Sequence, residues 1–300
     1  MRRILILICL ACFFKAEAQN PSALSIADSL YAVGNYSQAI SNYQRISPKN
    51  SDIYHKIARA NQAKGNLGDA LINYAEASSN SENTIARNEY GKLLITTSNY
   101  KAADSIFTLL IGAYKNNPNF YYQRGRAKMQ LPDTLTSVNA DSLTIENTSS
   151  FNYITDFEKA VALDSTHQKA LYQTAKYYLQ RKDYPLVERL CKKALESYPD
   201  NVEIISLLAQ DNLARGFMRD AIPLFEKLLE LGQNSQFIHE KLGMAYYKIR
   251  NYDRAIEHYQ KGLDFSDEDF KNAEKHGQLA ILFKNLPLDG DYYTLGNTYK

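Results

Sequence analysis

Four basic side chains recur at a regular spacing through the middle of this chain of 300 residues. Arg59, Lys92, Arg126 and Lys176 each follow a small residue directly, and the intervals between them are 33, 34 and 50 residues. Guanidinium and ammonium groups donate charge-assisted hydrogen bonds, so a row of them is suited to carboxylates. If the elements that carry these cations stack in register, the cations form a basic stripe that suits an extended acidic peptide.

The sequence carries no motif of a known catalytic or metal centre. It contains no HExxH, no GxxxxGK[ST], no strand-associated GxGxxG and no GxSxG. Its histidines have no Cys or carboxylate neighbours at metal-ligand spacing, and we expect them on the surface or along a groove: they are His55, His167, His239, His258 and His276. These observations predict a binding protein without a cofactor or a metal, and not an enzyme.

Composition narrows the class of protein further. Lys and Arg number 35 against 33 Asp and Glu, which argues against a nucleic-acid-binding protein that depends on bulk positive charge. Hydrophobic residues make up 45% of the chain, with only 13 Gly and 8 Pro, and this favours an all-helical fold. Three hundred residues exceed the usual size of one compact domain, so we expect two domains or an elongated array of repeats.

A repeated unit of about 34 residues accounts for most of the chain. The eighth place of each unit is small: Ala27, Ala58, Gly91, Gly125, Ala175, Ala209 and Gly243. The twentieth place is Ala in five units, namely Ala39, Ala70, Ala103, Ala221 and Ala255, and is Tyr153 or Val187 in the other two. The twenty-fourth place is aromatic in six units, namely Tyr43, Tyr74, Phe107, Phe157, Phe225 and Tyr259, and is Cys191 in the fifth.

This spacing predicts that each unit is a helix, a tight turn and a second helix. In turns such as Gly34-Asn35, the Gly suits the left-handed residue that ends a helix, and the Asn accepts free amides that begin the next. Small residues at the eighth and twentieth places let the two helices approach closely, and we expect the aromatic ring to pack against the next unit. Cys191 is interpreted as a small buried hydrophobic residue.

The pattern resembles the tetratricopeptide repeat family, most clearly in Leu242-Gly243 with Tyr246 and in the stretch 251–259. The resemblance covers residues 20–269 as seven units and implies an all-α, right-handed superhelical solenoid of about seven helix pairs. In this family the first helices line an inner groove, which their second, fifth, ninth, twelfth and thirteenth places face. That implies a partner-binding groove with these candidate residues: Arg59, Lys92, Arg126, Lys176, His55, Tyr122 and Tyr172.

The first eighteen residues have the pattern of an export signal. Arg2 and Arg3 precede an apolar run over residues 4–14, and Ala16-Glu17-Ala18 has the small-x-small pattern of a cleavage site. The run is too short to span a bilayer. We therefore expect cleavage after Ala18, export to the periplasm or cell envelope of a bacterium, and no transmembrane span in the mature chain. The alternative is a lipoprotein acylated at Cys12.

Two stretches depart from the repeat. Residues 132–152 form an insert in the fourth unit with three acidic residues and no Lys or Arg, and we expect a polar loop, with a small hairpin as the alternative. Residues 270–300 are expected to form an extra helix and a partial further repeat or cap. Because a solenoid end normally carries a polar cap, this end suggests either a longer protein or a segment that folds back.

The sequence as a whole predicts a non-enzymatic scaffold of the bacterial cell envelope that binds a protein or peptide, with an acidic segment as the favoured ligand, and not nucleic acid. Two other functions stay open at this point. One is the N-terminal sensing or interaction part of a longer receptor or enzyme. The other is an outer-membrane lipoprotein that acts as an assembly factor.

Overall fold

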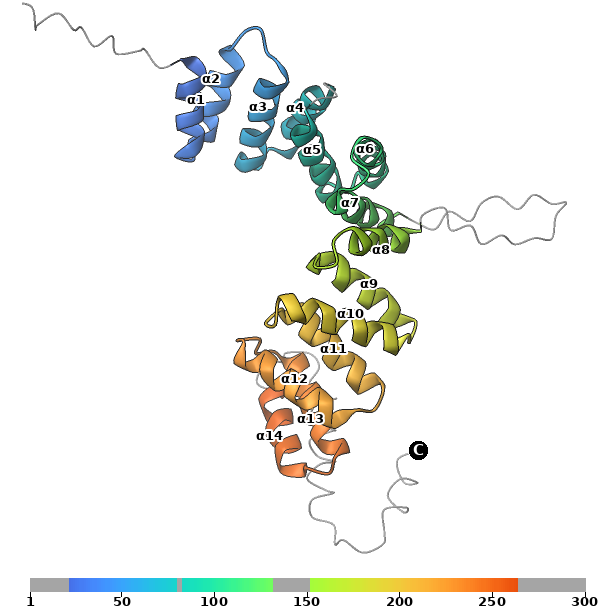
Figure 1. Ribbon diagram of the computed structural model, residues 1–300. Coiled ribbons are helices and arrows are strands. Elements are labelled where there is room, and N and C mark those ends of the chain that lie inside the picture. Colours follow the sequence, from blue (N-terminus) through green and yellow to red (C-terminus); the bar gives the residue numbers. More distant parts are fainter. Residues whose placement is uncertain (1–21, 80–82, 132–151, 264–300) are drawn as a thin grey trace, which may run out of the picture. The chain divides into compact units, whose positions relative to one another are not determined.

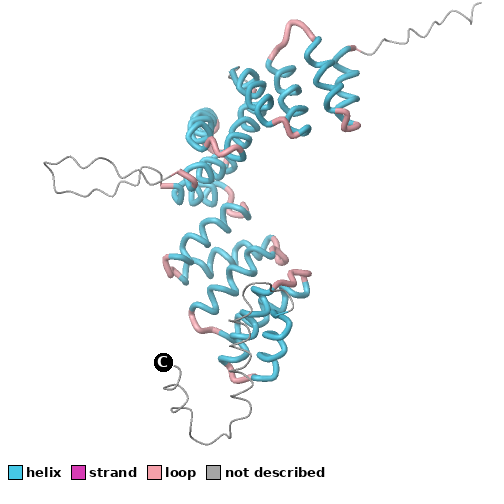
Figure 2. Tube along the Cα trace, turned by 180° about the vertical axis from the view of Figure 1, so that it is seen from behind, coloured by secondary structure: helices cyan, strands magenta, loops and turns pink. Residues whose placement is uncertain are grey.

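A computed structural model describes residues 22–79, 83–131 and 152–263 (Figures 1 and 2). Over these ranges the chain forms fourteen α-helices and no strand: α1 (Ala23–Ala32), α2 (Tyr36–Arg45), α3 (Ser51–Lys64), α4 (Leu67–Ser79), α5 (Thr84–Thr96), α6 (Tyr100–Ala113), α7 (Pro118–Met129), α8 (Tyr153–Leu163), α9 (Gln168–Gln180), α10 (Tyr184–Ser197), α11 (Val202–Ala214), α12 (Met218–Glu230), α13 (Gln236–Lys248) and α14 (Tyr252–Leu263). The prediction of an all-α solenoid of helix pairs is confirmed. The predicted signal peptide 1–18, residues 132–151 of the insert and the segment 270–300 lie outside the described residues.

The helices belong to two compact units, which are described separately. The first unit holds α1 to α6 and the end of α7, and the second holds the start of α7 and α8 to α14. From α1 to α6 and from α8 to α14 each helix packs against the next one in the chain, so that α1 pairs with α2, α3 with α4 and α13 with α14 (Figure 1). Successive pairs also contact each other, as α2 does α3 and α12 does α13. Within the described ranges, no helix combines the length and apolar character needed to cross a membrane.

In the first and fifth repeats the turn between the two helices is built as predicted. Gly34 ends its helix with φ of +79°, and the non-glycine residue Lys182 takes the same left-handed conformation at the same place with φ of +62°. Asn35 then caps α2, since its side chain accepts a hydrogen bond from the backbone amide of Gln38. Asp183 caps α10 in the same way. In these two repeats, local sequence signals therefore define where the first helix ends and the second begins.

The small residue at the eighth place contacts the ring at the twenty-fourth place of its own repeat. A methyl group added to Gly91 would lie 2.7 Å from the Phe107 ring, and one added to Gly243 would lie 2.6 Å from the Tyr259 ring. All the small signature residues are buried: Ala27, Ala39, Ala58, Ala70, Gly91, Ala103, Gly125, Ala175, Ala209, Ala221, Gly243 and Ala255. The expectation that the ring packs against the next unit was thus incomplete, because the ring first fills the space between its own two helices.

The fourth repeat differs from the others in its second helix. In the other six repeats this helix begins three residues before the twentieth place, whereas α8 begins at that place, with Tyr153. The Tyr153 ring lies 5.6 Å from the Tyr177 ring, measured between centroids. Deeper in the repeat, Arg124 and the buried Asp156 form a bidentate ion pair with distances of 2.6 and 2.9 Å. The helix that follows the insert is therefore one turn shorter at its start and is held by a polar contact.

Replacing Gly91 with Ala is expected to lower the free energy of unfolding by about 1–3 kcal/mol, because the new methyl must displace the fully buried Phe107 ring. The matched control is Gly112→Ala in α6, where nothing lies within 4 Å of the added methyl. That change should leave stability unchanged or raise it by up to about 1 kcal/mol. Urea unfolding followed by circular dichroism measures both, and equal stability of the two variants would contradict the contact described here.

Candidate functional site

The first helices of three successive repeats line a pocket of about 510 Å³ in the first unit. The lining residues are Tyr31 from α1, Arg59, Gln62 and Ala63 from α3, Tyr74 from α4, and Glu89 and Lys92 from α5. Five of these seven occupy the ninth, twelfth or thirteenth place of their unit. Three of the five places that the family resemblance assigns to the inner groove thus contribute residues to one pocket, and two of the four predicted cations line it.

Glu89 is the acidic centre of this pocket. The Nε2 of His55 lies 2.6 Å from the Oε2 of Glu89, the Tyr74 hydroxyl lies 3.1 Å from the same oxygen, and the Nε of Arg59 lies 4.0 Å away. The hydrogen bond from His55 is the largest of the effects that lower the pKa of Glu89. Burial, followed by the Glu89 charge, raises the pKa of Tyr74. Glu89 is thus ionised at neutral pH and offsets part of the positive charge of Arg59.

Glu89 and Arg59 meet where the second and third repeats join. The junction between the first and second repeats has the same arrangement, with the acid and the base exchanged between the two places. Here the ninth place is the acid Asp28, and the sixth place of the next repeat is Lys56, whose Nζ donates to Asp28 at 2.7 Å. The Tyr43 hydroxyl donates to the same carboxylate at 2.5 Å. Burial acts to raise the pKa of Asp28, but the hydrogen bonds from Lys56 and Tyr43 outweigh it, and the pKa is lowered.

The sixth place of the repeat is not among the predicted groove-facing places, although the sequence carries a signal for it. The twenty-fourth residue of these two repeats is Tyr and not Phe, and a buried Tyr hydroxyl requires a hydrogen-bond acceptor. In both junctions that acceptor is the carboxylate that also pairs with a cation across the repeats.

The predicted groove residues differ in how accessible they are. Lys92 is exposed and makes no ion pair with any residue that the structure describes, whereas Arg59 stacks over the Tyr31 ring at 5.4 Å and faces Glu89. In the second unit, the exposed Lys176 lies 5.9 Å from the centroid of the half-buried Tyr172 ring. Arg126 is half-buried near the end of α7. The structure brings together Arg59 and Lys92, with His55 directly behind Glu89.

Tyr122 differs from the expectation that it offers contact area to a partner. Its side chain is buried, because its ring packs 5.8 Å from Phe157 and 5.1 Å from His167, measured between centroids. All three residues belong to the second unit. A place on the groove-facing side of the helix does not by itself expose a large ring, since neighbouring rings of the same unit cover it.

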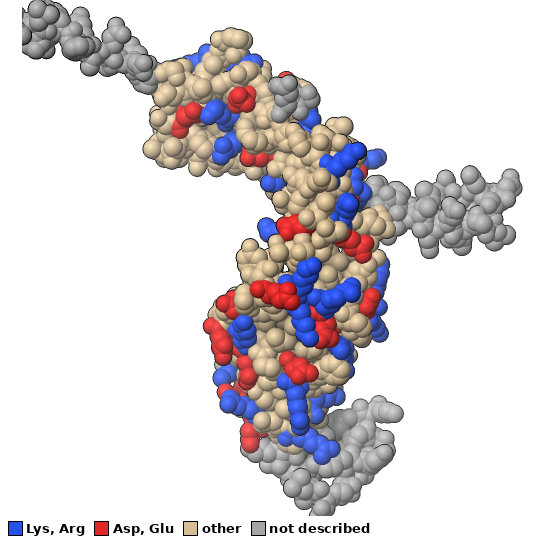
Figure 3. Space-filling model, viewed as in Figure 1, with Lys and Arg blue, Asp and Glu red and all other residues tan. Residues whose placement is uncertain are grey.

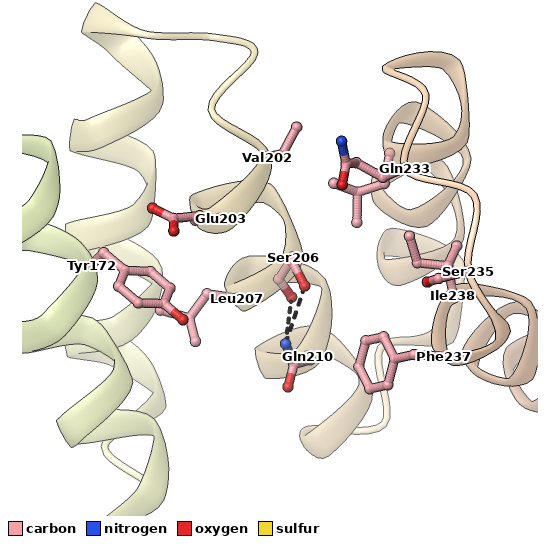
Figure 4. A pocket seen from close by; sticks show the side chains of 11 residues that line it. Tyr172, Val202, Glu203, Ser206, Leu207, Gln210, Gln233, Ser235, Phe237 and Ile238 are labelled. Atoms are coloured by element: carbon pink, nitrogen blue, oxygen red, sulfur yellow. Dashed lines mark hydrogen bonds between the residues drawn. The ribbon is translucent and has the colours of Figure 1, made fainter. Parts of the chain in front are cut away.

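A second pocket, of about 300 Å³, lies in the second unit and is also lined mainly by first helices (Figure 4). Tyr172 and Glu203 lie on one side of it, and Ser235 and Phe237 face them from the other. Between them, the Gln210 amide lies 3.2 Å from the backbone carbonyl of Ser206 and the same distance from its hydroxyl. Glu203 is the single charged residue among those that line this pocket. This pocket therefore combines apolar, aromatic and uncharged polar side chains with one acid, and no cation lines it among the described residues.

The two units also differ in surface charge. On the face shown in Figure 3, both units display charged side chains of both signs, and these are denser in the second unit. Much of the charge in the second unit is paired, for example Lys192 with Glu188 at 2.6 Å and Lys261 with Glu257 at 2.8 Å. Exposed ion pairs of this kind add little to stability, but they neutralise the surface locally.

Two histidines correct the expectation that all of them are on the surface or in the groove. His239 on α13 and His258 on α14 are buried, and their Nδ1 atoms lie 3.0 Å apart. The Nε2 of His239 also lies 2.8 Å from the Oδ1 of Asn234, and the His258 ring stacks on Tyr246 at 5.6 Å. The two residues meet because they occupy the facing places that Leu171 and Leu190 fill in the core of the fifth repeat.

The described residues contain no cluster of three or more His, Cys, Asp or Glu side chains arranged to hold a metal ion. Cys191 is fully buried, and burial raises the pKa of its thiol to about 12. Thiolate chemistry at neutral pH is therefore suppressed at this residue, which supports its interpretation as a small core residue.

Comparison with known proteins agrees with this architecture. Residues 236–269, the seventh predicted unit, match the tetratricopeptide repeat family. The C-terminal part of a TPR repeat-containing protein from Cytophaga hutchinsonii is similar in structure, with a TM-score of 0.62 and 19% identity over 84% of this chain and 98% of that one. A tetratricopeptide repeat protein from Parabacteroides merdae has a TM-score of 0.56 and 15% identity over 86% and 97% of the two chains.

A third solved structure, YrrB, is described as a TPR protein with an unusual peptide-binding site. It has a TM-score of 0.51 and 15% identity over 71% of this chain and 98% of that one. One repeat of this chain, residues 236–269, matches the tetratricopeptide repeat family in sequence, and the described helices have the fold of TPR solenoids. Solenoids of this fold present extended concave surfaces, which is consistent with a role in protein–protein interaction.

The buried histidine pair should make the second unit sensitive to acid. Burial, followed by the nearby His239, lowers the pKa of His258 to about 4, whereas an unfolded His titrates near 6.5. Stability is therefore fully present above about pH 6.5 and is lost as the pH falls toward 4, by up to about 3 kcal/mol, because the unfolded chain binds the proton first.

Urea unfolding followed by circular dichroism at pH 7.5 and pH 5 measures this loss. The double variant His239→Leu/His258→Leu copies the apolar pair of the fifth repeat and should show a smaller loss over the same range. An equal loss in the variant and the parent protein would show that the histidine pair is not its source.

Proposed function

We propose that this protein is a non-enzymatic scaffold of the bacterial cell envelope that holds an acidic segment of a partner protein in the groove lined by its first helices. The observation that carries the proposal is the pocket of the first unit, where Arg59 and Lys92 face one concave space beside Tyr31. An arginine and a lysine placed together bind carboxylates, and the tyrosine adds contact area at little cost in conformational entropy.

Within this pocket Arg59 and Lys92 have different roles. Lys92 is free of acidic partners among the described residues, so it is the group available to a carboxylate of the ligand. Arg59 is held in place between the Tyr31 ring and Glu89, which orients its guanidinium toward the pocket. A preformed site of this kind loses little entropy on binding. The peptide-binding site that YrrB is described as having supports the view that a solenoid of this fold can hold an extended peptide.

Export to the envelope is the second part of the proposal and rests on residues 1–18. The basic Arg2 and Arg3, the apolar run and Ala16-Glu17-Ala18 form the tripartite pattern of a secretory signal. The mature chain then keeps only Cys191, so that its fold needs no disulfide in an oxidising compartment.

A photo-crosslinking amino acid at Ala63, which lines the pocket, should capture the partner in intact bacteria. The same amino acid at Ala75, exposed on α4 away from the pocket, should capture little of it. The charge reversal Arg59→Glu/Lys92→Glu should reduce the Ala63 adduct about tenfold or more, because two charge-assisted hydrogen bonds are lost.

The matched control for charge is Lys49→Glu/Lys101→Glu, which makes the same change in net charge at exposed residues outside the pocket. It should leave the adduct unchanged. If both double variants behave alike, or if Ala75 captures the partner as well as Ala63 does, the groove is not the binding site.

Mass spectrometry of the mature protein purified from envelopes tests export. We expect a chain that begins at Gln19, because the cleavage pattern ends at Ala18. A chain that begins at a diacylated Cys12 would instead establish a lipoprotein and favour the assembly-factor function. An intact Met1 in the cytoplasmic fraction would contradict both.

A further inference from the structure

His55 lies directly behind the pocket of the first unit and contacts Glu89, the one carboxylate among the described residues that line it. Its side chain is 14% exposed, and its Nε2 is 2.6 Å from the Oε2 of Glu89. A carboxylate only accepts hydrogen bonds, so Nε2 carries the hydrogen and the neutral ring has its lone pair on Nδ1. That Nδ1 makes no hydrogen bond with any described residue. It is therefore the atom on which His55 takes up a second proton.

The groups around His55 make its charge matter to the pocket. Tyr74 of α4 and Glu89 of α5 are the titratable groups that contact its ring, and Arg59 lies one turn further along α3. On the side of α1 and α2, Asp28 is bonded to Lys56 and Tyr43 and not to His55. The charge seen by a ligand in the pocket is thus set by Arg59 and Lys92 against Glu89, and His55 controls how much of the Glu89 charge is offset.

With a neutral His55, Arg59 and Lys92 together with Glu89 give the pocket a net charge of one positive unit. A protonated His55 forms a full ion pair with Glu89, whose pKa is already lowered by this contact, and the pocket then has two uncompensated cations. The ion pair needs no movement of the side chains, because the hydrogen bond already exists.

We propose that this pocket binds its acidic partner segment with uptake of a proton at His55, so that affinity rises as the pH falls. This inference rests on the proposed function and adds its regulation. Imidazoles change charge between about pH 8 and 5, a range over which Glu and Asp side chains of a partner stay ionised. One added charge at a distance of about 6–8 Å strengthens binding of a carboxylate roughly threefold to tenfold.

The test is a binding titration of the full chain with a fluorescein-labelled peptide of alternating Glu and Ala, ten residues long, by fluorescence anisotropy at pH 7.5 and 5.5. The parent protein should bind about threefold to tenfold more tightly at pH 5.5. His55→Gln keeps a donor for Glu89 but cannot be charged, and should bind weakly at both pH values. His55→Lys is charged throughout and should bind tightly at both.

Two controls separate this effect from other effects of acid. His167→Asn removes a histidine of the second unit but keeps a helix-capping acceptor, and should retain the pH dependence of the parent. The His239→Leu/His258→Leu background removes the buried pair, and the pH dependence should persist in it.

The outcomes distinguish this inference from the proposed function. Suppose that Arg59→Glu/Lys92→Glu abolishes binding. If the parent protein then binds equally tightly at both pH values, or if His55→Gln keeps the pH dependence, the proton linkage is overturned and the groove function stands. No binding at either pH, or binding that the charge reversal does not weaken, overturns the groove function itself.

Discussion

The contact on which the rest of the structure depends is the one between the small eighth residue and the ring at the twenty-fourth place of the same repeat. Where the eighth residue is Gly, the ring lies closer than any side chain would allow, as Phe107 does to Gly91 and Tyr259 to Gly243. Burial of one such ring stabilises the fold by roughly 1.5–3 kcal/mol, so a single pair of helices cannot be stable by itself. Repetition of this contact fixes the separation of the two helices, and with it the face that the first helix turns toward the concave side.

Once the helices are placed in this way, the junctions between repeats determine the chemistry of the inner face. In the first two junctions a tyrosine hydroxyl binds a carboxylate that also meets a cation, first as Asp28 with Lys56 and then as Glu89 with Arg59. These contacts use charges that would otherwise be available to a ligand. Lys92 lacks such a partner among the described residues, and this is the physical reason why the pocket beside it is suited to a carboxylate.

The second unit uses the same architecture for a different surface. Its pocket is lined by tyrosine, phenylalanine, amide and hydroxyl groups with Glu203 as the charged residue, and many of its surface charges are paired with each other. One repeat pattern can therefore present chemically distinct pockets, because the places that build the core are separate from the places that face the groove. The proton linkage inferred for His55 and the acid sensitivity of the His239–His258 pair follow from the same separation, since one lies at the groove and the other in the core.

The sequence by itself determined the helix pairs, their turns and caps, and the small residues that had to be buried, because these features depend on local conformational preference and on a period that repeats seven times. The groove-facing places were a prediction from the resemblance to the tetratricopeptide repeat family. It did not reveal that Tyr122 is covered by Phe157 and His167, that His239 and His258 touch, or that Glu89 joins His55, Tyr74 and Arg59. Such contacts join side chains on different helices, and only the tertiary packing decides them, because a period defines the face of a helix and not which residue of a neighbouring helix lies opposite.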